Sequence, residues 1–315
     1  MQLLKPIAIA CMSTLLSLNA HATSFLVFGD MPYSEMDKAM LTKPNGALVK
    51  QAASVKHDFI VHVGDMKAGA APCTDDLLQQ NYALISSVSH QPFIYTPGDN
   101  DWTDCDREAL NPKFDELERL NFVREHFAVQ KPNLPHFERQ SSMPENQAWR
   151  VDDVQFVTLH VPGTNNGRRQ ILLSDKKAVH AESHRRDTEN MKWLTAHLAE
   201  QNTAAVVFLQ ADLYQPQKHS GRCDKDSKAK CDGYQLYRET LAQYAAKLDY
   251  PLLLIHGDTG EFCFSKQSSN LWRLNAPGDF QYLDIARVKI AQDKKQPFNV
   301  KPLLSKAKIN ACKQP

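Results

Sequence analysis

The stretch Phe25-Leu26-Val27-Phe28-Gly29-Asp30 is a short apolar run that ends in Gly-Asp. Three later apolar runs end in the same way, at Gly64-Asp65, Gly98-Asp99 and Gly257-Asp258. Short apolar runs without polar alternation are typical of strands that are buried on both faces. The Gly permits a sharp turn out of the strand. The Asp then lies at the carboxyl end of the strand, which is the edge where open α/β sheets bind ligands.

The four repeated aspartates, Asp30, Asp65, Asp99 and Asp258, are candidate metal ligands. Carboxylates that meet at one sheet edge repel one another and raise their own pKa values unless a cation lies among them. The alternative is that each Asp only caps a following helix or turn, which is a common role for Asp after a strand. Because the pattern occurs at four strand ends, the sequence favours the metal site.

Helical and strand patterns alternate in the first half of the chain, and strands dominate the last third. Helices are predicted at 45–56, 75–88, 113–127, 188–201 and 234–248. Strands are predicted at 25–29, 59–63, 93–96, 147–151, 154–160, 204–209, 252–256, 271–275 and 280–289. Helical crossovers between strands indicate parallel pairing. The pattern as a whole predicts an α/β fold with two packed mixed β-sheets flanked by helices.

Residues 1–22 have the features of a signal peptide. Lys5 supplies a positive charge, an apolar core runs from Pro6 to Leu18, and Ala20-His21-Ala22 matches the small-residue cleavage pattern. We therefore expect cleavage before Thr23 and a single domain over 23–315. The apolar core is too short for a membrane span. The chain is predicted to be exported, to a periplasm or to the outside of the cell, without a membrane span.

The formal net charge of the whole chain is +1. No global basic excess indicates binding to nucleic acid or to a membrane surface.

Six cysteines remain after the predicted cleavage, and an even number in an exported protein indicates disulfides. Sequence alone allows many pairings. Cys223 and Cys231 bracket a short polar loop and are the first choice. Cys73 and Cys105 follow neighbouring strand exits, which leaves Cys263 to pair with Cys312. Free buried thiols are the weaker alternative, and a zinc–thiolate site is disfavoured because no C-x-x-C spacing occurs.

The order Gly29-Asp30, Gly64-Asp65, Gly98-Asp99-Asn100-Asp101 and Gly257-Asp258 resembles the motifs of the calcineurin-like metallophosphoesterase superfamily. The resemblance covers most of the chain after the signal peptide. The segment Asp99-Asn100-Asp101-Trp102 is similar to a divergent branch in which Gly-Asp-Asn-Glu/Asp-Trp occurs. The resemblance implies a four-layer sandwich and one or two divalent metal ions that clamp a phosphate and activate a hydroxide for in-line attack.

Within this resemblance, Asp30 and Asp65 match the two Asp ligands, and Asp65 matches the bridging carboxylate. Asp99 takes the place of a ligand Asn, while Gln210 takes the place of a lone ligand His. Asp258 takes the place of the first His in a closing G-H-x-H motif.

Further imidazoles of the family pattern are missing, because Pro32, Gln210 and Gly260 also stand where the family has His. The remaining ligand set consists almost entirely of oxygen atoms. Carboxylate and carbonyl ligands suit Mg²⁺, Mn²⁺ or Ca²⁺ better than Zn²⁺, so the resemblance implies Mn²⁺ or Mg²⁺.

Asn100 takes the place of the family's catalytic His, and Asp101 the place of the acid that orients it. An Asn side chain cannot transfer a proton, so another acid or a good leaving group is required. His160 and His256, which end predicted strands, are candidates for this acid. For both, a hydrogen-bonded packing role is the alternative.

The polar loop with Asn165, Asn166, Arg168 and Arg169 is a candidate phosphate-binding segment, because Arg pairs bidentately with phosphate. The alternative is a solvated loop.

These observations predict an exported metal-dependent phosphoesterase that acts on a phosphorylated small molecule or a phosphodiester. The alternative is a metallophosphoesterase-like protein that has lost catalysis and binds a ligand or partner.

Overall fold

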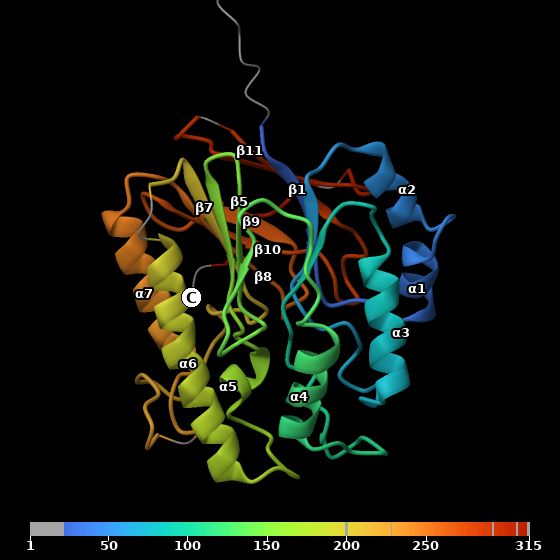
Figure 1. Ribbon diagram of the computed structural model, residues 1–315, viewed down its shortest axis with the longest axis vertical. Coiled ribbons are helices and arrows are strands. Elements are labelled where there is room, and N and C mark those ends of the chain that lie inside the picture. Colours follow the sequence, from blue (N-terminus) through green and yellow to red (C-terminus); the bar gives the residue numbers. More distant parts are fainter. Residues whose placement is uncertain (1–21, 199–200, 228, 292, 307, 314–315) are drawn as a thin grey trace, which may run out of the picture.

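The computed structural model describes residues 22–198, 201–227, 229–291, 293–306 and 308–313. The predicted signal peptide lies outside the described residues except for Ala22. Two mixed β-sheets lie in the middle of the structure, with helices on both outer sides (Figure 1). The predicted α/β architecture is therefore confirmed.

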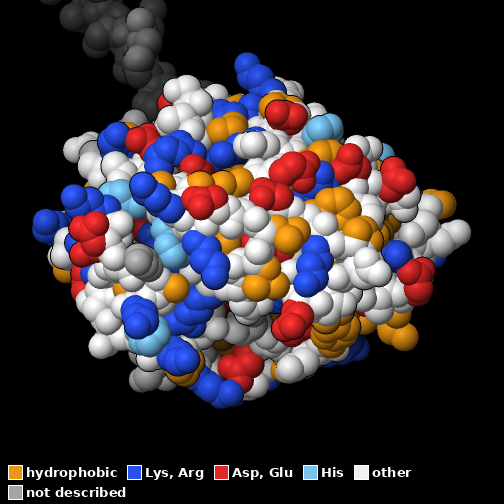
Figure 2. All heavy atoms as spheres, turned by 90° about the horizontal axis from the view of Figure 1, so that it is seen from below, with side chains coloured by type: hydrophobic (Ala, Val, Ile, Leu, Met, Phe, Trp, Pro, Cys, Tyr) orange, Lys and Arg blue, Asp and Glu red, His pale blue; other side chains and the backbone are white. Residues whose placement is uncertain are grey.

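Charged side chains of both signs are distributed over the face seen from below (Figure 2). Lys and Arg are more frequent on one side of this face, with Asp and Glu between them. This mixture agrees with the small formal net charge.

The first sheet has five strands in the order β12-β11-β1-β2-β3. β1 (Ser24–Phe28), β2 (Phe59–His62) and β3 (Phe93–Tyr95) are parallel. β11 (Ala286–Ile290) pairs antiparallel with β1, and β12 (Phe298–Pro302) pairs antiparallel with β11. The chain therefore begins and ends its strand sequence in the same sheet.

The second sheet has seven strands in the order β4-β5-β6-β7-β8-β10-β9. Its strands are β4 (Glu138–Arg139), β5 (Gln147–Val151), β6 (Val154–Thr158), β7 (Ala204–Phe208), β8 (Leu252–His256), β9 (Cys263–Lys266) and β10 (Leu271–Asn275). β6, β7, β8 and β10 are parallel to one another, while β4, β5 and β9 pair antiparallel at the two edges.

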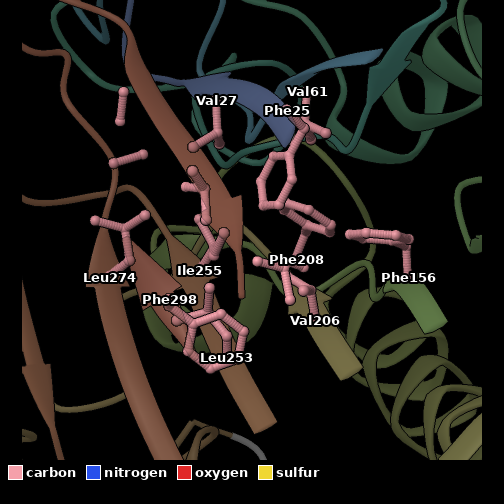
Figure 3. Packing of buried hydrophobic residues seen from close by; sticks show 14 of the residues in the cluster. Phe25, Val27, Val61, Phe156, Val206, Phe208, Leu253, Ile255, Leu274 and Phe298 are labelled. Carbon is pink, nitrogen blue, oxygen red and sulfur yellow. The ribbon is translucent and has the colours of Figure 1, made fainter. Parts of the chain in front are cut away.

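The space between the sheets is filled by aromatic and branched side chains (Figure 3). Phe25 stacks on Phe59 with ring centroids 5.1 Å apart, and it meets the edges of Phe156 and Phe208 at 5.6 Å each. The intervening residues of β1, such as Leu26, point to the opposite face and pack against helices. Burial on both faces explains why these strands show no polar alternation.

Helices cover the outer face of each sheet. They are α1 (Glu35–Leu41), α2 (Ala47–Ser54), α3 (Asp75–Ser86) and α4 (Glu116–His126) on the first sheet, and α6 (Lys176–Leu198) and α7 (Gln235–Lys247) on the second. A further short segment, α5 (Gly163–Gly167), lies below the sheets. No described helix is both long enough and apolar enough to cross a membrane.

Two predicted elements differ most from the structure in where they begin. The helix predicted at 188–201 already begins at Lys176, because Val179, Ser183 and Arg186 are buried although this part of the sequence is mostly polar. The strand predicted from 280 begins only at Ala286, since residues 279–281 form a turn in which Tyr282 N donates to Gly278 O at 3.3 Å. Asp284 then accepts backbone N–H groups from Ile285 at 2.7 Å and from Leu303 at 3.0 Å.

All three predicted disulfides are confirmed. Cys73–Cys105, Cys223–Cys231 and Cys263–Cys312 have Cα–Cα distances of 5.5, 5.0 and 4.8 Å. The first joins the loops that follow β2 and β3. Disulfides of this number are typical of an oxidising compartment, outside the cytosol.

Candidate metal centre

The carboxyl ends of four strands from both sheets meet at one edge. The backbone N–H of Asp30 donates to Gly64 O at 3.0 Å, which joins the ends of β1 and β2. The N–H of Asp258, after β8, donates to the Asp30 carboxylate at 3.2 Å. Gly257 N donates to Gln210 O at 2.9 Å, which joins the ends of β8 and β7. The strand exits are thus tied to one another across the two sheets.

Three of the four predicted aspartates form a tight cluster. Asp65, Asp99 and Asp258 each offer a carboxylate oxygen, and these atoms lie within 4.8 Å of one another. Oxygen ligands of a Ca²⁺, Mg²⁺ or Mn²⁺ ion lie about 2–2.6 Å from it, so this spacing fits one ion. The fourth, Asp30, adjoins the cluster through its contact with the Asp258 N–H.

The backbone at this edge has an uncommon conformation. Asp30, Asp65 and Asp258 have φ angles of 51°, 61° and 71°, in the left-handed region. Asp tolerates this region better than most residues do, but the conformation still costs free energy and is concentrated at functional sites. None of the four aspartates caps a helix; α3 and α4, for example, begin after Thr74 and Asp115. The capping alternative is therefore wrong.

Gly163, the first residue of α5, lies against the cluster. A Cβ atom at this position would lie 2.5 Å from Asp99 Oδ2 and 2.7 Å from Asp258 Oδ1. Any side chain here would displace both carboxylates, so the close approach requires Gly.

Asp101, predicted as an orienting acid, fastens two of the loops together. Its buried carboxylate accepts hydrogen bonds from Gly98 N at 2.8 Å, Asp65 N at 2.9 Å, Met66 N at 2.9 Å and Tyr95 Oη at 2.7 Å. These bonds hold the loop after β2 against the loop after β3. Asp101 thus orients the backbone that carries Asp65.

Asn100 lies in the cluster, where the motif placed it. Its Nδ2 donates to Asp65 Oδ2 at 2.9 Å and to Tyr33 Oη at 3.1 Å. The Tyr33 hydroxyl in turn lies 3.2 Å from Asp65 Oδ2 and 3.4 Å from Asp30 Oδ1. Sequence reasoning missed Tyr33, because no repeated motif marks its position.

Gln210, a predicted ligand, presents its amino group to the carboxylates. Nε2 donates to Asp65 Oδ2 at 3.2 Å and to Asp99 Oδ1 at 3.1 Å, whereas Oε1 accepts the N–H of Gly163 at 2.5 Å. In this arrangement Gln210 neutralises part of the repulsion between two carboxylates as a hydrogen-bond donor.

Thr164 and Asp104 extend the cluster and were also missed. Thr164 Oγ1 lies 2.7 Å from Asp99 Oδ2 and 2.9 Å from Asp104 Oδ1, and Arg107 forms an ion pair with Asp104. Burial and the neighbouring Asp99 raise the pKa of Asp104 to about 8.

The cluster contains more negative charge than its donors balance. Burial raises the pKa of Asp30, Asp65 and Asp258 well above the usual value, and the charges of Asp99 and Asp30 raise the pKa of Asp65 and Asp258 further. A divalent cation would compete with these protons. An all-oxygen set of carboxylates fits a hard divalent cation, and the identity of the ion is not fixed by the geometry.

His160 and His256 both have internal partners. His160 Nδ1 lies 3.0 Å from Glu145 Oε1, and its Nε2 accepts the Trp102 Nε1–H at 3.0 Å. His256 Nε2 accepts from Arg273 Nε at 2.8 Å. Burial lowers the pKa of each imidazole to about 4. The ring nitrogens of His160 and Nε2 of His256 are thus engaged by other side chains of the protein.

The predicted phosphate-binding loop forms α5 and the residue after it. Thr164, Asn165 and Asn166 have φ angles of 52°, 57° and 56°, so α5 is a left-handed turn. Such a turn is disfavoured for L-residues other than Gly, and Asn tolerates it best.

The polar groups of this turn are bound by the protein itself. Asn165 Oδ1 accepts Gly233 N at 2.9 Å, and Asn166 Nδ2 donates to Asp187 Oδ1 at 2.7 Å. Arg168 pairs with Asp187 Oδ2 at 2.5 Å. All three predicted substrate-binding side chains are buried. The solvated-loop alternative is wrong, and these contacts give the three residues a structural use.

No protein-family model matches the chain, and no curated protein is similar to it in sequence. Solved structures are similar in fold. A dimetal phosphatase from Danio rerio superposes with a TM-score of 0.55 at 12% identity, over 89% of this chain and 95% of that one. A 5'-nucleotidase from Candida albicans reaches a TM-score of 0.46 at 11% identity, over 89% of this chain and 51% of its own.

These structural neighbours are calcineurin-like metallophosphoesterases. The resemblance inferred from the Gly-Asp motifs is thus confirmed for the fold: this chain is a metallophosphoesterase-like sandwich with a cluster of aspartates at the shared edge of its sheets.

Proposed function

We propose that the protein is an exported, metal-dependent phosphoesterase that hydrolyses a phosphomonoester or phosphodiester. The observation that carries this proposal is the convergence of Asp65, Asp99 and Asp258 within 4.8 Å. The fold supports it, because the same sandwich occurs in a dimetal phosphatase. The three disulfides support export.

Asp65, Asp99 and Asp258 would hold a metal ion, with Asp30 beside them for the same or a second ion. Gln210 would join them through Oε1 only after its amide turns over, since Nε2 now faces the carboxylates. When bound, a hard divalent cation supplies a Lewis acid that polarises a phosphoryl oxygen and lowers the pKa of water. The all-oxygen set favours Mn²⁺ or Mg²⁺ over Zn²⁺.

The other polar groups at the edge are hydrogen-bond donors that could orient a phosphate. Asn100 Nδ2 and the hydroxyls of Tyr33 and Thr164 all reach candidate ligands. Asn100 cannot act as a general acid, a contribution that is usually worth about 10²–10⁴-fold. We therefore expect esters with good leaving groups, such as nitrophenyl phosphate, to be hydrolysed much faster than alkyl phosphates.

A second candidate is a binding protein with the same fold and no catalysis, which the absence of imidazole ligands favours. At position 260 this absence is built into the packing. A Cβ atom on Gly260 would lie 2.7 Å from Asp279 Oδ2 and 3.0 Å from Gln281 Nε2. A His side chain would thus need both neighbours to move.

The test combines elemental analysis of the purified protein with a screen of phosphomonoesters and phosphodiesters in Mn²⁺, Mg²⁺, Ca²⁺ and Zn²⁺. The proposal predicts bound divalent metal and hydrolysis of nitrophenyl esters in Mn²⁺ or Mg²⁺. Absence of hydrolysis with every ion would support the binding protein instead. Strong Zn²⁺-dependent hydrolysis of alkyl phosphates would contradict the all-oxygen ligand set.

A further inference from the structure

Phe280 is the most exposed of the large apolar side chains that the structure describes, at 70%. Its ring lies next to the ring of Tyr33, with centroids 5.3 Å apart and planes tilted by 51°. The Tyr33 hydroxyl contacts the carboxylates of Asp65 and Asp30. The two rings therefore extend from the carboxylate cluster to the solvent, with Tyr33 at the cluster and Phe280 outside it.

The residue before Phe280 is hydrogen-bonded to the backbone of a candidate ligand. Asp279 N donates to Asp30 O at 2.8 Å, and Phe280 N donates to Asp279 Oδ1 at 2.7 Å. The preceding Gly278 lies so close to the backbone oxygen of Gly29 that a Cβ atom would collide with it. The segment that carries Phe280 thus has a fixed position relative to Asp30.

A single exposed aromatic side chain on a protein surface needs no explanation. Phe280 differs because its ring contacts Tyr33 of the candidate site and the residue before it is hydrogen-bonded to Asp30. A phosphate held at the cluster would direct its ester group outward, past the hydroxyl of Tyr33. An aromatic group there would meet the open face or edge of Phe280, and aromatic pairs prefer offset or edge-to-face contact at such distances.

We propose that Phe280, supported by Tyr33, forms an aromatic wall that binds a planar aromatic group of the substrate. The substrate class is a phosphate ester whose organic group carries an aromatic ring, either an aryl alcohol or a nucleoside. This inference rests on the proposed function, and it adds that binding selects the organic group as well as the phosphate.

The experiment compares wild-type protein with Phe280→Ala, Phe280→Trp and a matched control, Val129→Ala, in Mn²⁺. Val129 is 51% exposed and follows α4. KM is measured for phenyl phosphate, adenosine monophosphate and glycerol phosphate. Because each substrate is compared with itself across variants, differences in intrinsic leaving-group reactivity cancel.

We expect Phe280→Ala to raise KM for an aromatic ester about 5–10-fold more than KM for glycerol phosphate, as loss of one aromatic contact predicts. Phe280→Trp should restore the wild-type preference, and Val129→Ala should change none of the three values. A selective effect on phenyl phosphate alone identifies an aryl substrate, and one on adenosine monophosphate alone identifies a nucleoside. Equal changes for all three esters, or no change, would overturn the proposal.

Calorimetry separates this inference from the proposed function. Phenyl phosphate and glycerol phosphate are titrated into wild-type protein and into Phe280→Ala in the presence of Ca²⁺. The measured quantity is the dissociation constant, which does not depend on hydrolysis being detected. Weaker binding of phenyl phosphate alone to Phe280→Ala supports the aromatic wall even if no ester is hydrolysed. Equal or absent binding in both proteins overturns it, even if hydrolysis is observed.

Discussion

The carboxylate cluster and the left-handed turn α5 lie against each other, and both are polar, but their hydrogen bonding is opposite in kind. In the cluster, Asp65, Asp99 and Asp258 face one another, and like charges raise the pKa values of Asp65 and Asp258. In α5, the Asn165 side chain accepts a hydrogen bond from Gly233 N, and the Asn166 side chain donates one to Asp187. Polar groups that are hydrogen-bonded within the protein stabilise the fold, whereas carboxylates that repel one another would be stabilised by a bound cation.

Asp101 shows that position alone does not decide between these two roles. It lies two residues after Asp99, yet it receives four hydrogen bonds from the neighbouring loops. Asp65 also accepts hydrogen bonds, but its carboxylate faces those of Asp99 and Asp258, whereas Asp101 lies outside this cluster.

Substitution of Asp65 in the carboxylate cluster should produce the largest loss of activity. Asp65→Asn should lower kcat/KM for nitrophenyl phosphate by about 10³-fold or more, because a metal-held phosphoryl group is stabilised by several kcal/mol. It should also raise the Tm of the protein in EDTA, since a repelling charge is removed. Steady-state kinetics, metal analysis and calorimetry measure these changes.

The matched control is Asp101→Asn, which makes the same chemical change in a carboxylate that lies outside the cluster. This variant should have a lower Tm in EDTA, because an amide cannot accept all the bonds that the carboxylate does. A higher Tm for Asp101→Asn, or wild-type activity for Asp65→Asn, would contradict the assignment of a structural role to Asp101 and a metal-binding role to Asp65.

Substitution in the buried ion pair between Arg168 and Asp187 should produce the next largest effect. We expect it to change the stability of the protein but not its activity. Arg168→Met leaves Asp187 without its cation, and breaking a buried pair usually costs about 3–5 kcal/mol. Urea unfolding should show this loss, while kcat/KM per folded molecule stays within about twofold, since the guanidinium faces Asp187. Unchanged stability with a large rise in KM would instead make Arg168 a substrate-binding residue.

The contact between the two regions can be tested at Gly163. Gly163→Ala places a methyl group against Asp99 and Asp258, so metal affinity should fall about 10–100-fold, as it does when ligand orientation is disturbed. Calorimetric titration with Mn²⁺ measures the affinity, and circular dichroism in EDTA should show an unchanged fold. Wild-type affinity would mean that these two carboxylates do not act together as ligands.

The buried carboxyl pair Asp106 and Glu116, outside the cluster, should give the smallest effect, a change in how stability depends on pH. Both side chains are buried, and both accept backbone N–H groups from the 172–174 segment. Burial and the neighbouring Asp106 raise the pKa of Glu116 from 4.5 to about 7. A raised pKa means that folding favours the protonated form, so its stabilising effect is complete below pH 4.5 and is lost as the pH rises through 7.

Glu116→Gln should remove this part of the pH dependence. The difference in unfolding free energy between variant and wild type should change by about 1–2 kcal/mol between pH 4.5 and 7.5, in favour of the variant at the higher pH. Urea titrations across this range measure it. A constant difference would show that Glu116 ionises normally.

The fold was predictable to the extent that its strands are short, apolar and end in recognisable turns. β8 and the β5–β6 hairpin occupy the predicted ranges closely, and the three predicted disulfide pairs are present. One pair was predicted from neighbouring strand exits, one from a short polar loop, and the third from the two cysteines that remained. α6 was predicted too short and β11 too long. In both places contacts outside the local pattern decide the bounds: buried polar residues in α6, and before β11 the turn at 279–281 and the bonds to the Asp284 carboxylate.

The site was predictable only where a motif repeats. The four aspartates share a position after a strand, so the sheet edge brings them together. Tyr33, Thr164 and Asp104 share no such pattern, and only the folded loops place them at the cluster. The partners of Asn166 and Arg168 come from α6, which no local sequence feature indicates.

The direct hydrogen bond between Asp258 and Asp30 spans 228 residues of sequence. Contacts of such long range form late, because a large loop must close before they stabilise anything. The ligand set is therefore completed only after β8 has docked, and a nascent chain that lacks β8 has no complete centre. Uptake of the proposed ion would then follow folding, and the compartment in which the chain finishes folding would decide which ion is bound.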